Sequence, residues 1–87
     1  MTAVLHNRIT LLRTERNVSR KDLAEAVGVN FQTIGYLERG DYSPSLELAM
    51  KIARFFAMPV EMVFSFEPFQ PLTAELMQAK AKIAGDA

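Results

Sequence analysis

The stretch from Arg20 to Arg39 constrains the fold of this chain most, because it predicts two short helices joined by a tight turn. In both halves, apolar residues recur at the three-and-four spacing of a one-sided helical face, namely Leu23, Ala24, Val27, Ile34 and Leu37. Between the halves, Gly28 can adopt the positive φ that ends a helix, and Asn30 can cap the next helix. The second helix is therefore expected to pack across the first.

Ala24 lies where the two helices must cross, and a side chain larger than its methyl group would separate them. The stretch belongs to a longer series of characteristic fragments. In chain order these are NRITLLR, VSRKDLAEAVGV, TIGYLERG and PSLELAMKIARFF. Together they resemble the phage-repressor-like (Xre-type) helix-turn-helix family of DNA-binding proteins, over roughly residues 6 to 64. The resemblance implies an all-α domain of five helices that binds double-stranded DNA.

The 87 residues are enough for one small domain with one hydrophobic core. Cysteine is absent, and no apolar run approaches the ~20 residues of a membrane span, so we expect a cytoplasmic protein without membrane contact. His6 is the only histidine, and it lacks the context of a metal site or a catalytic triad. A solvent-exposed histidine is the simpler interpretation of His6 than a catalytic one, and we expect neither an enzyme nor a cofactor.

Helical periodicity and capping signals predict where the helices lie. They are expected at about Val4–Arg16, after the cap Ser19, at Phe31–Arg39, from the cap Ser45 to near Phe56, and at Pro59–Phe64. The expected buried stripes are Leu5, Ile9 and Leu12 in the first helix and Leu46, Ala49, Ile52, Ala53 and Phe56 in the fourth. We expect residues 1–64 to form the DNA-binding domain and residues 65–87 to form an extension, with a short extended segment and a last helix near Thr73–Ala84.

The family resemblance also places the DNA-reading surface, because the second helix of this motif enters the major groove. With Ile34 and Leu37 facing inward, the candidates for base contact are Asn30, Phe31, Gln32, Gly35 and Tyr36. Gln32 is the best of these, since its amide can pair with adenine N7 and N6, although glutamine is also common on solvated helix faces.

The other candidates for base contact each have a second reading. Asn30 can serve as the helix cap instead, and Phe31 either contacts a thymine methyl group or covers the edge of the core. Tyr36 can contact a methyl group or a phosphate. Gly35 has no side chain, and its cost within a helix is up to ~1 kcal/mol, so it is either required by close approach of DNA or merely tolerated.

Net charge does not identify a DNA-binding protein here, because ten basic residues balance ten acidic ones. Local geometry must supply the positive field. The candidate phosphate-binding residues are Arg8, Arg20, Thr33, Arg39 and Tyr42, provided that the acids Glu15, Asp22 and Glu25 point elsewhere. The family usually has glutamine in place of Arg20, where it contacts a phosphate.

Arg13 and Glu38 occupy apolar-facing positions in the first and third expected helices. In the family, the matching residues form a partly buried salt bridge that ties the recognition helix to the first helix. A guanidinium and a carboxylate can pair in fork geometry, which limits the desolvation cost. The alternative is two separate surface charges.

The aromatic-rich tail predicts a partner surface, because exposed aromatic groups form an apolar patch. We expect a homodimer interface from Phe64, Phe66, Phe69, Leu72 and Leu76, with the extended stretch pairing across a two-fold axis. The alternative is that the phenylalanines fold back onto their own domain. The expected function is a transcription regulator, acting as a dimeric repressor on two half-sites. The rival is an antitoxin-like module that binds a toxin or co-regulator through the tail.

Overall fold

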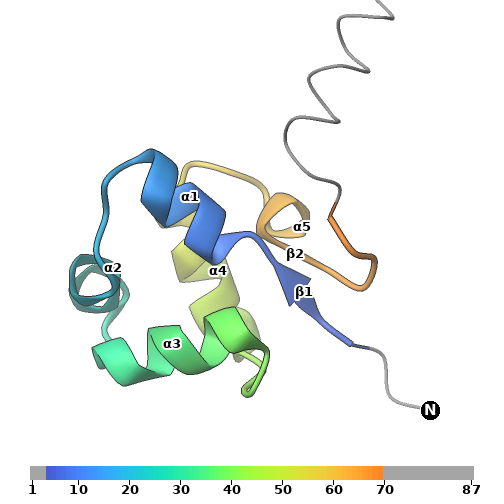
Figure 1. The fold of residues 1–87 in the computed structure, drawn as a ribbon, viewed down its shortest axis with the longest axis horizontal. Helices are drawn as coiled ribbons and strands as arrows, with labels where there is room; N and C mark the ends of the chain where they lie inside the picture. Colours follow the sequence, from blue (N-terminus) through green and yellow to red (C-terminus); the bar gives the residue numbers. More distant parts are fainter. Residues whose placement is uncertain (1–3, 70–87) are drawn as a thin grey trace, which may run out of the picture.

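The structure, a computed structural model, describes residues 4–69. This part of the chain folds into five helices and a two-stranded antiparallel sheet (Figure 1). The elements are β1 (His6–Asn7), α1 (Ile9–Glu15), α2 (Arg20–Val27), α3 (Phe31–Arg39), α4 (Leu46–Phe55), α5 (Val60–Val63) and β2 (Phe64–Ser65). The expected five-helix class is confirmed, and the small sheet is an addition that the sequence pattern did not predict.

Local capping sets the starts of α2, α3 and α4, as predicted. The side-chain oxygens of Ser19, Asn30 and Ser45 each accept a hydrogen bond from the backbone N–H three residues further along the chain. Gly28 and Gly40 end α2 and α3 in the left-handed conformation, with φ of 81° and 78°. The three side-chain caps satisfy N–H groups that have no partner within the helix at its start.

The expected start of the first helix at Val4 is wrong, because α1 begins at Ile9. The preceding residues form β1, which pairs with β2 from the other end of the domain. Asn7 explains the break in the helix, since its Oδ1 accepts from the backbone N–H of Ile9 at 3.1 Å. Its Nδ2 donates to the carbonyl of Leu37 at 2.9 Å and ties β1 to the end of α3.

The core is built from apolar residues of all five helices and β2. They are Ile9, Leu12, Leu23, Ala24, Val27, Ile34, Leu37, Leu48, Ala49, Ile52, Ala53, Phe56, Val63 and Phe64. The expected burial of Leu46 is wrong, since 73% of this residue is exposed and Leu48 is buried instead. Leu46 precedes the buried Ile52 by six residues, and a rotation of about 100° per residue takes it off the buried face.

The last helix of the domain is shorter than the expected Pro59–Phe64. Pro59 precedes α5 in an extended conformation, and the chain leaves the helix at Phe64 to enter β2. Ala57, which stands where the family usually has glycine, has a φ of 56°. A left-handed alanine costs about 1 to 2 kcal/mol, so local packing must offset this strain.

Phe64 does not have the role that the sequence predicted for it. It lies in the core of its own chain with 7% exposure, and β2 pairs with β1 of the same chain, so the fold-back alternative holds for this residue. Phe66 is 68% exposed, whereas Phe69 is half-buried. Leu72, Leu76 and the expected helix near residues 73–84 lie outside the described residues.

Figure 1 shows α3 along one edge of the domain, α2 at one end and the sheet at the opposite end. α1 and α4 lie between these ends, and α3 packs chiefly against α2. Within residues 4–69, no helix has the length and apolar character needed to cross a bilayer.

Candidate nucleic-acid interface

α2 and α3 pack against each other through the side chains that the sequence pattern turned inward. Leu23, Ala24 and Val27 of α2 are buried with Ile34 and Leu37 of α3. Ala24 is only 2% exposed, in agreement with a crossing that has room for a methyl group and little more. This packing fixes which side of α3 faces solvent.

The outward side of α3 carries three of the residues predicted to contact bases. Gln32 is exposed, and Phe31 and Tyr36 are 56% and 48% exposed. Phe31 therefore does not cover the core edge, which was its alternative role. Asn30 serves as the helix cap, with Oδ1 accepting from the backbone N–H of Thr33 at 2.9 Å and from its hydroxyl at 3.1 Å.

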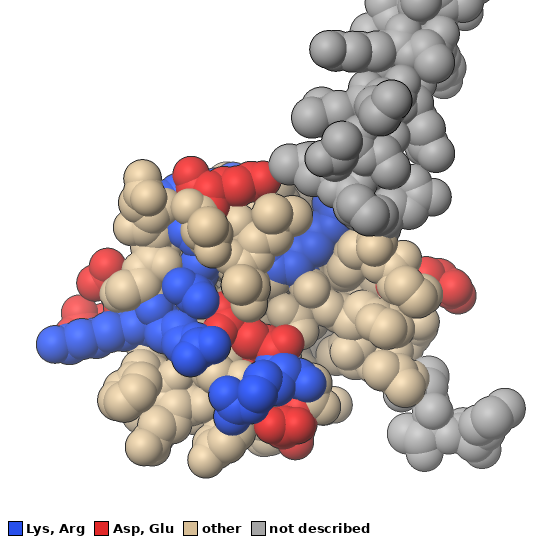
Figure 2. All heavy atoms as spheres, in the orientation of Figure 1, with Lys and Arg blue, Asp and Glu red and all other residues tan. Residues whose placement is uncertain are grey.

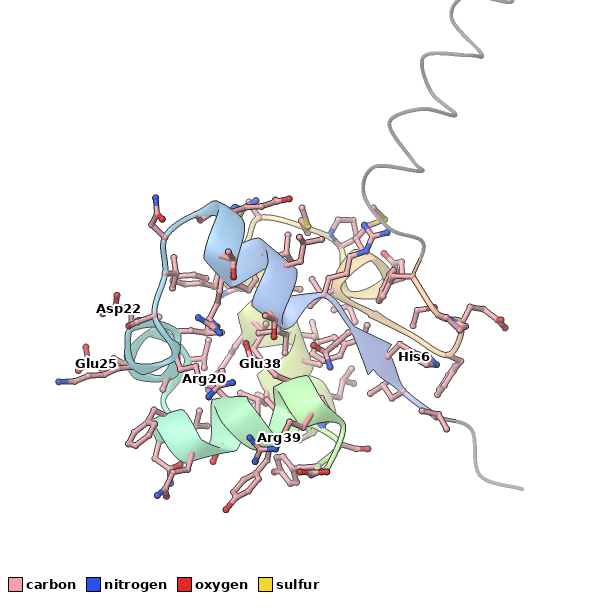
Figure 3. The ribbon with its side chains drawn as sticks, in the orientation of Figure 1. His6, Arg20, Asp22, Glu25, Glu38 and Arg39 are labelled. Carbon is pink, nitrogen blue, oxygen red and sulfur yellow. The ribbon has the colours of Figure 1, made fainter. Side chains whose placement is uncertain are left out.

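The carboxylate of Glu38 joins α1, α2 and α3 in one cluster of charges (Figure 3). Arg13 places Nε 2.8 Å from Glu38 Oε2, so the salt bridge expected from the sequence is present. Arg20 places Nε 2.6 Å from Glu38 Oε1, a pairing that the sequence did not predict. Only 2% of the Glu38 side chain is exposed, compared with 15% for Arg13 and 47% for Arg20.

The environment of Glu38 acts on its pKa in two opposing ways. Burial alone would raise the pKa of this carboxyl, because it disfavours the charged form. Hydrogen bonds from Arg13 and Arg20, the charge of Arg13 and a hydrogen bond from Thr10 together outweigh burial, and the pKa lies below its ordinary value. Glu38 is therefore ionised at neutral pH and holds both guanidinium groups in place.

Arg39 lies on the exposed surface at the end of α3. Its Nε donates to Asp41 Oδ2 at 3.0 Å, and its guanidinium carbon lies 5.1 Å from the centre of the Tyr36 ring. Tyr42, another predicted phosphate-binding residue, follows in the next loop and is 48% exposed. Thr33 is half-buried beside Asn30.

Arg8 differs from the other predicted phosphate-binding residues. It is half-buried, and its guanidinium carbon lies 4.2 Å from the centre of the Phe69 ring. A cation that packs this closely on an aromatic face is engaged within its own chain. Arg8 is thus a weaker candidate for phosphate contact than Arg20 or Arg39.

The acidic residues of α2 point away from the exposed face of α3. Asp22 and Glu25 lie on the side of α2 that faces away from Arg39 (Figure 3). Figure 2 shows basic side chains over α2 and α3, with acidic atoms between them. Basic side chains therefore gather on this face, although the whole chain has no net charge.

Sequence comparison identifies the family to which this chain belongs, because a helix-turn-helix family model matches residues 9–62. The protein belongs to the Xre-type helix-turn-helix family. It is a transcriptional regulator with a DNA-binding helix-turn-helix domain, and several of its relatives are named as HTH-type transcriptional regulators.

Two relatives resemble this helix-turn-helix protein over 63 residues, which cover 72% of its chain and 96% of each relative. They are uncharacterised HTH-type transcriptional regulators, one from Methanocaldococcus jannaschii with 43% identity and YgzD from Bacillus subtilis with 44% identity. The RstR transcriptional repressor of the cryptic phage CTXphi from Vibrio cholerae is 34% identical over 59 residues, 68% of this chain and 53% of RstR.

The fold is also found in a solved structure, that of a proposed DNA-binding protein from Bacteroides fragilis. The two share a TM-score of 0.64 and 24% identity, over 70% of this helix-turn-helix protein and 98% of the other chain. At this level of identity the similarity supports the fold alone.

Proposed function

We propose that the protein is a sequence-specific DNA-binding repressor that reads operator DNA with α3 and acts as a dimer. The arrangement of α3 carries this proposal: Ile34 and Leu37 anchor one side in the core, and Gln32 and Tyr36 lie on the exposed side. Arg39 lies at the end of the same helix with its guanidinium exposed to solvent.

Gln32 is the residue that we assign to base recognition. Its amide can donate to adenine N7 and accept from adenine N6, forming two hydrogen bonds in the major groove. Phe31 has no polar group, and its 56% exposed ring is suited to a thymine methyl group. Because Asn30 already bonds the start of α3, we assign it to helix capping rather than to base contact.

Arg20, Arg39 and Tyr42 are the residues that we assign to phosphate contact. All three are exposed, and two of them carry a full positive charge. Such contacts fix the position of the protein on the duplex but carry little sequence information. Thr33 offers a hydroxyl near the start of α3 and is a secondary candidate.

The repressor mechanism that we propose is occlusion. A two-fold dimer would place its two copies of α3 in successive major grooves, on half-sites about 34 Å apart, and would exclude other proteins from the operator. One of the relatives is a phage transcriptional repressor, which supports repression rather than activation.

Exposed apolar groups near the sheet support a dimer. Phe66 is 68% exposed and borders a shallow hollow of about 540 Å³, which Leu46 and Val60 also line. A surface of this kind is typical of a protein interface. We place the dimer contact at Phe66 and Phe69, together with the segment that follows them.

Selection from a random pool of DNA duplexes with the purified full chain tests this function. We expect enrichment of a palindromic sequence whose half-site centres are separated by about 10 base pairs or a multiple of one helical turn. A pool that stays random after repeated rounds, at a salt concentration where the protein binds DNA, would contradict sequence-specific recognition.

A further inference from the structure

A shallow apolar groove of about 650 Å³, here called the α4–α5 groove, lies over α4 and the start of α5. Leu46 and Met50 line it one helical turn apart and are 73% and 53% exposed. Met58 and Val60 also line it, and both pack against the core. No residue of α2 or α3 lines this groove, so it is separate from the surface assigned to DNA.

The α4–α5 groove adjoins the hollow beside Phe66, because Leu46 and Val60 line both. Phe66 is 68% exposed at that hollow, and Met50 is exposed in the groove. The exposed apolar groups therefore form one surface that extends from α4 to the residues after β2. A contiguous apolar surface of this kind is typical of a site that another segment covers.

The sequence of the tail contains a segment that suits this surface. Its apolar residues recur at helical spacing, at Leu72, Leu76, Ala79 and Ile83. A helix over residues 72–83 would be about 18 Å long, and the part of α4 that lines the groove is about 12 Å long. The stripe is therefore long enough to cover the groove. The matched family model ends at residue 62, so this segment is an addition to the family domain.

The charged residues beside the groove match those of the tail in order. Along α4, Glu47 precedes Lys51 and Arg54 at the groove. Along the tail, one acidic residue precedes two basic ones, namely Glu75, Lys80 and Lys82. A tail helix antiparallel to α4 would bring opposite charges together at both ends, whereas a parallel helix would bring like charges together.

The place where the tail leaves its own domain favours the groove of a second copy. The ring centre of Phe69 lies 4.2 Å from the guanidinium carbon of Arg8, and Phe69 lines a different hollow, together with residues of β1 and the end of α3. That hollow and the α4–α5 groove have no lining residue in common. Two residues separate Phe69 from Leu72, and this link spans at most about 11 Å. The tail therefore starts beside another surface of its own domain.

We propose that the α4–α5 groove is the docking site for residues 72–83 of a second copy of this chain. The proposal rests on the dimer of the proposed function and names the surface that the tail binds. Each copy gives its tail and receives that of its partner, so the two contacts are identical and are related by a two-fold axis. Because no residue of α3 lines the groove, both recognition helices stay free for DNA.

Engineered disulfides test the occupant of the groove, because the chain has no cysteine of its own. Full chains with Leu46→Cys and full chains with Ile83→Cys are mixed and oxidised. We expect a covalent dimer with one copy of each, which forms about tenfold or more faster than with Leu11→Cys in place of Leu46→Cys, since docking raises the local concentration. Leu11 is a 38% exposed residue of α1 and serves as the control. Equal rates, or an intramolecular disulfide in a monomer that carries both cysteines, would overturn the proposal.

Sedimentation of the full chain separates the docking site from the proposed function. Leu46→Gln together with Met50→Gln should raise the dissociation constant of the dimer about tenfold or more, because both side chains lose their apolar cover. Both residues are exposed in the single domain, so its unfolding should change little, and Leu11→Gln is the matched control. An unchanged dissociation constant would overturn the docking site and leave the repressor proposal intact. A dimer that weakens as expected, in a protein that selects no DNA sequence, would support the docking site and reject sequence-specific recognition.

Discussion

Arg20 Nε lies 2.6 Å from Glu38 Oε1, so the first residue of α2 is joined to the end of α3 by a carboxylate that Arg13 also binds. This ion pair connects the exposed surface of the helix-turn-helix unit with the interior of the domain. Because Glu38 is nearly fully buried, it limits where the Arg20 guanidinium can lie.

Removal of the Glu38 carboxylate should destabilise the fold. We expect Glu38→Ala to lower the free energy of unfolding by about 3 kcal/mol, because it strands the Arg13 charge in a site that is mostly closed to solvent. Replacing Arg13 by Met and Glu38 by Leu together should recover most of this loss. Urea unfolding measures both variants.

The exposed pair between Glu47 and Lys51, 3.5 Å apart on α4, provides the control. Glu47→Ala should change the free energy of unfolding by less than about 0.5 kcal/mol. If Glu38→Ala also costs less than about 0.5 kcal/mol, the cluster does not hold the domain together.

The lowered pKa of Glu38 predicts a loss of stability in acid. The folded pKa lies below the ordinary value of 4.5, so the unfolded chain takes up a proton first as the pH falls. Glu38 therefore contributes stability that is present above about pH 4.5 and is lost as the pH falls through the folded pKa. Unfolding measured from pH 7 to pH 3 should show a shallower decline for Glu38→Gln than for the parent protein. Parallel curves would refute this assignment.

The parts of the fold that depend on neighbouring residues were predictable from the sequence. Ser19, Asn30 and Ser45 each bond a backbone group three residues away, so the starts of three helices follow from local pattern. The start of α1 was not predictable in this way. Residues 6 and 7 satisfy their backbone groups by pairing with β2, and helical periodicity contains no information about so distant a partner.

The same distinction applies to the charged site. The pairing of Arg13 with Glu38 followed from a family pattern and from the inward spacing of both residues. The pairing of Arg20 with Glu38 depends on the crossing of α2 and α3, and Arg20 itself stands at an exposed helix start without a periodic signal. The prediction for Phe64 is wrong for a related reason, since Phe64 lies in the core of its own chain and β1, with which its strand pairs, lies far away in the sequence.

DNA binding should depend steeply on salt if phosphate contacts supply most of the affinity. A dimer that makes about six phosphate contacts should show a slope near −5 of log affinity against log salt concentration. Arg39→Ala should weaken binding to all sequences alike and should reduce the slope by about one for each phosphate that is no longer neutralised. Fluorescence anisotropy between about 50 and 200 mM salt measures this, and a slope near zero would rule out an electrostatic interface.

The tail should be needed for dimer formation. A chain ending after Glu67 keeps β2 and the Ser65 bond to the Glu67 backbone, but it lacks Phe69 and all residues that follow. We expect this chain, with Phe66→Gln added, to sediment as a monomer and to bind the operator more weakly. Leu11→Gln, which changes an apolar residue of α1 with 38% exposure, is the control and should stay dimeric. A truncated protein that remains a dimer would place the interface elsewhere.

The affinity of Gln32→Ala for selected and for shuffled duplexes tests the central claim most directly. Because Gln32 is exposed on α3 and makes no contribution to the core, the variant should fold as the parent does. We expect it to lose about 1 to 3 kcal/mol on the selected duplex and almost nothing on the shuffled one. Equal losses on both duplexes, or no loss on either, would contradict the claim that α3 reads DNA sequence through Gln32.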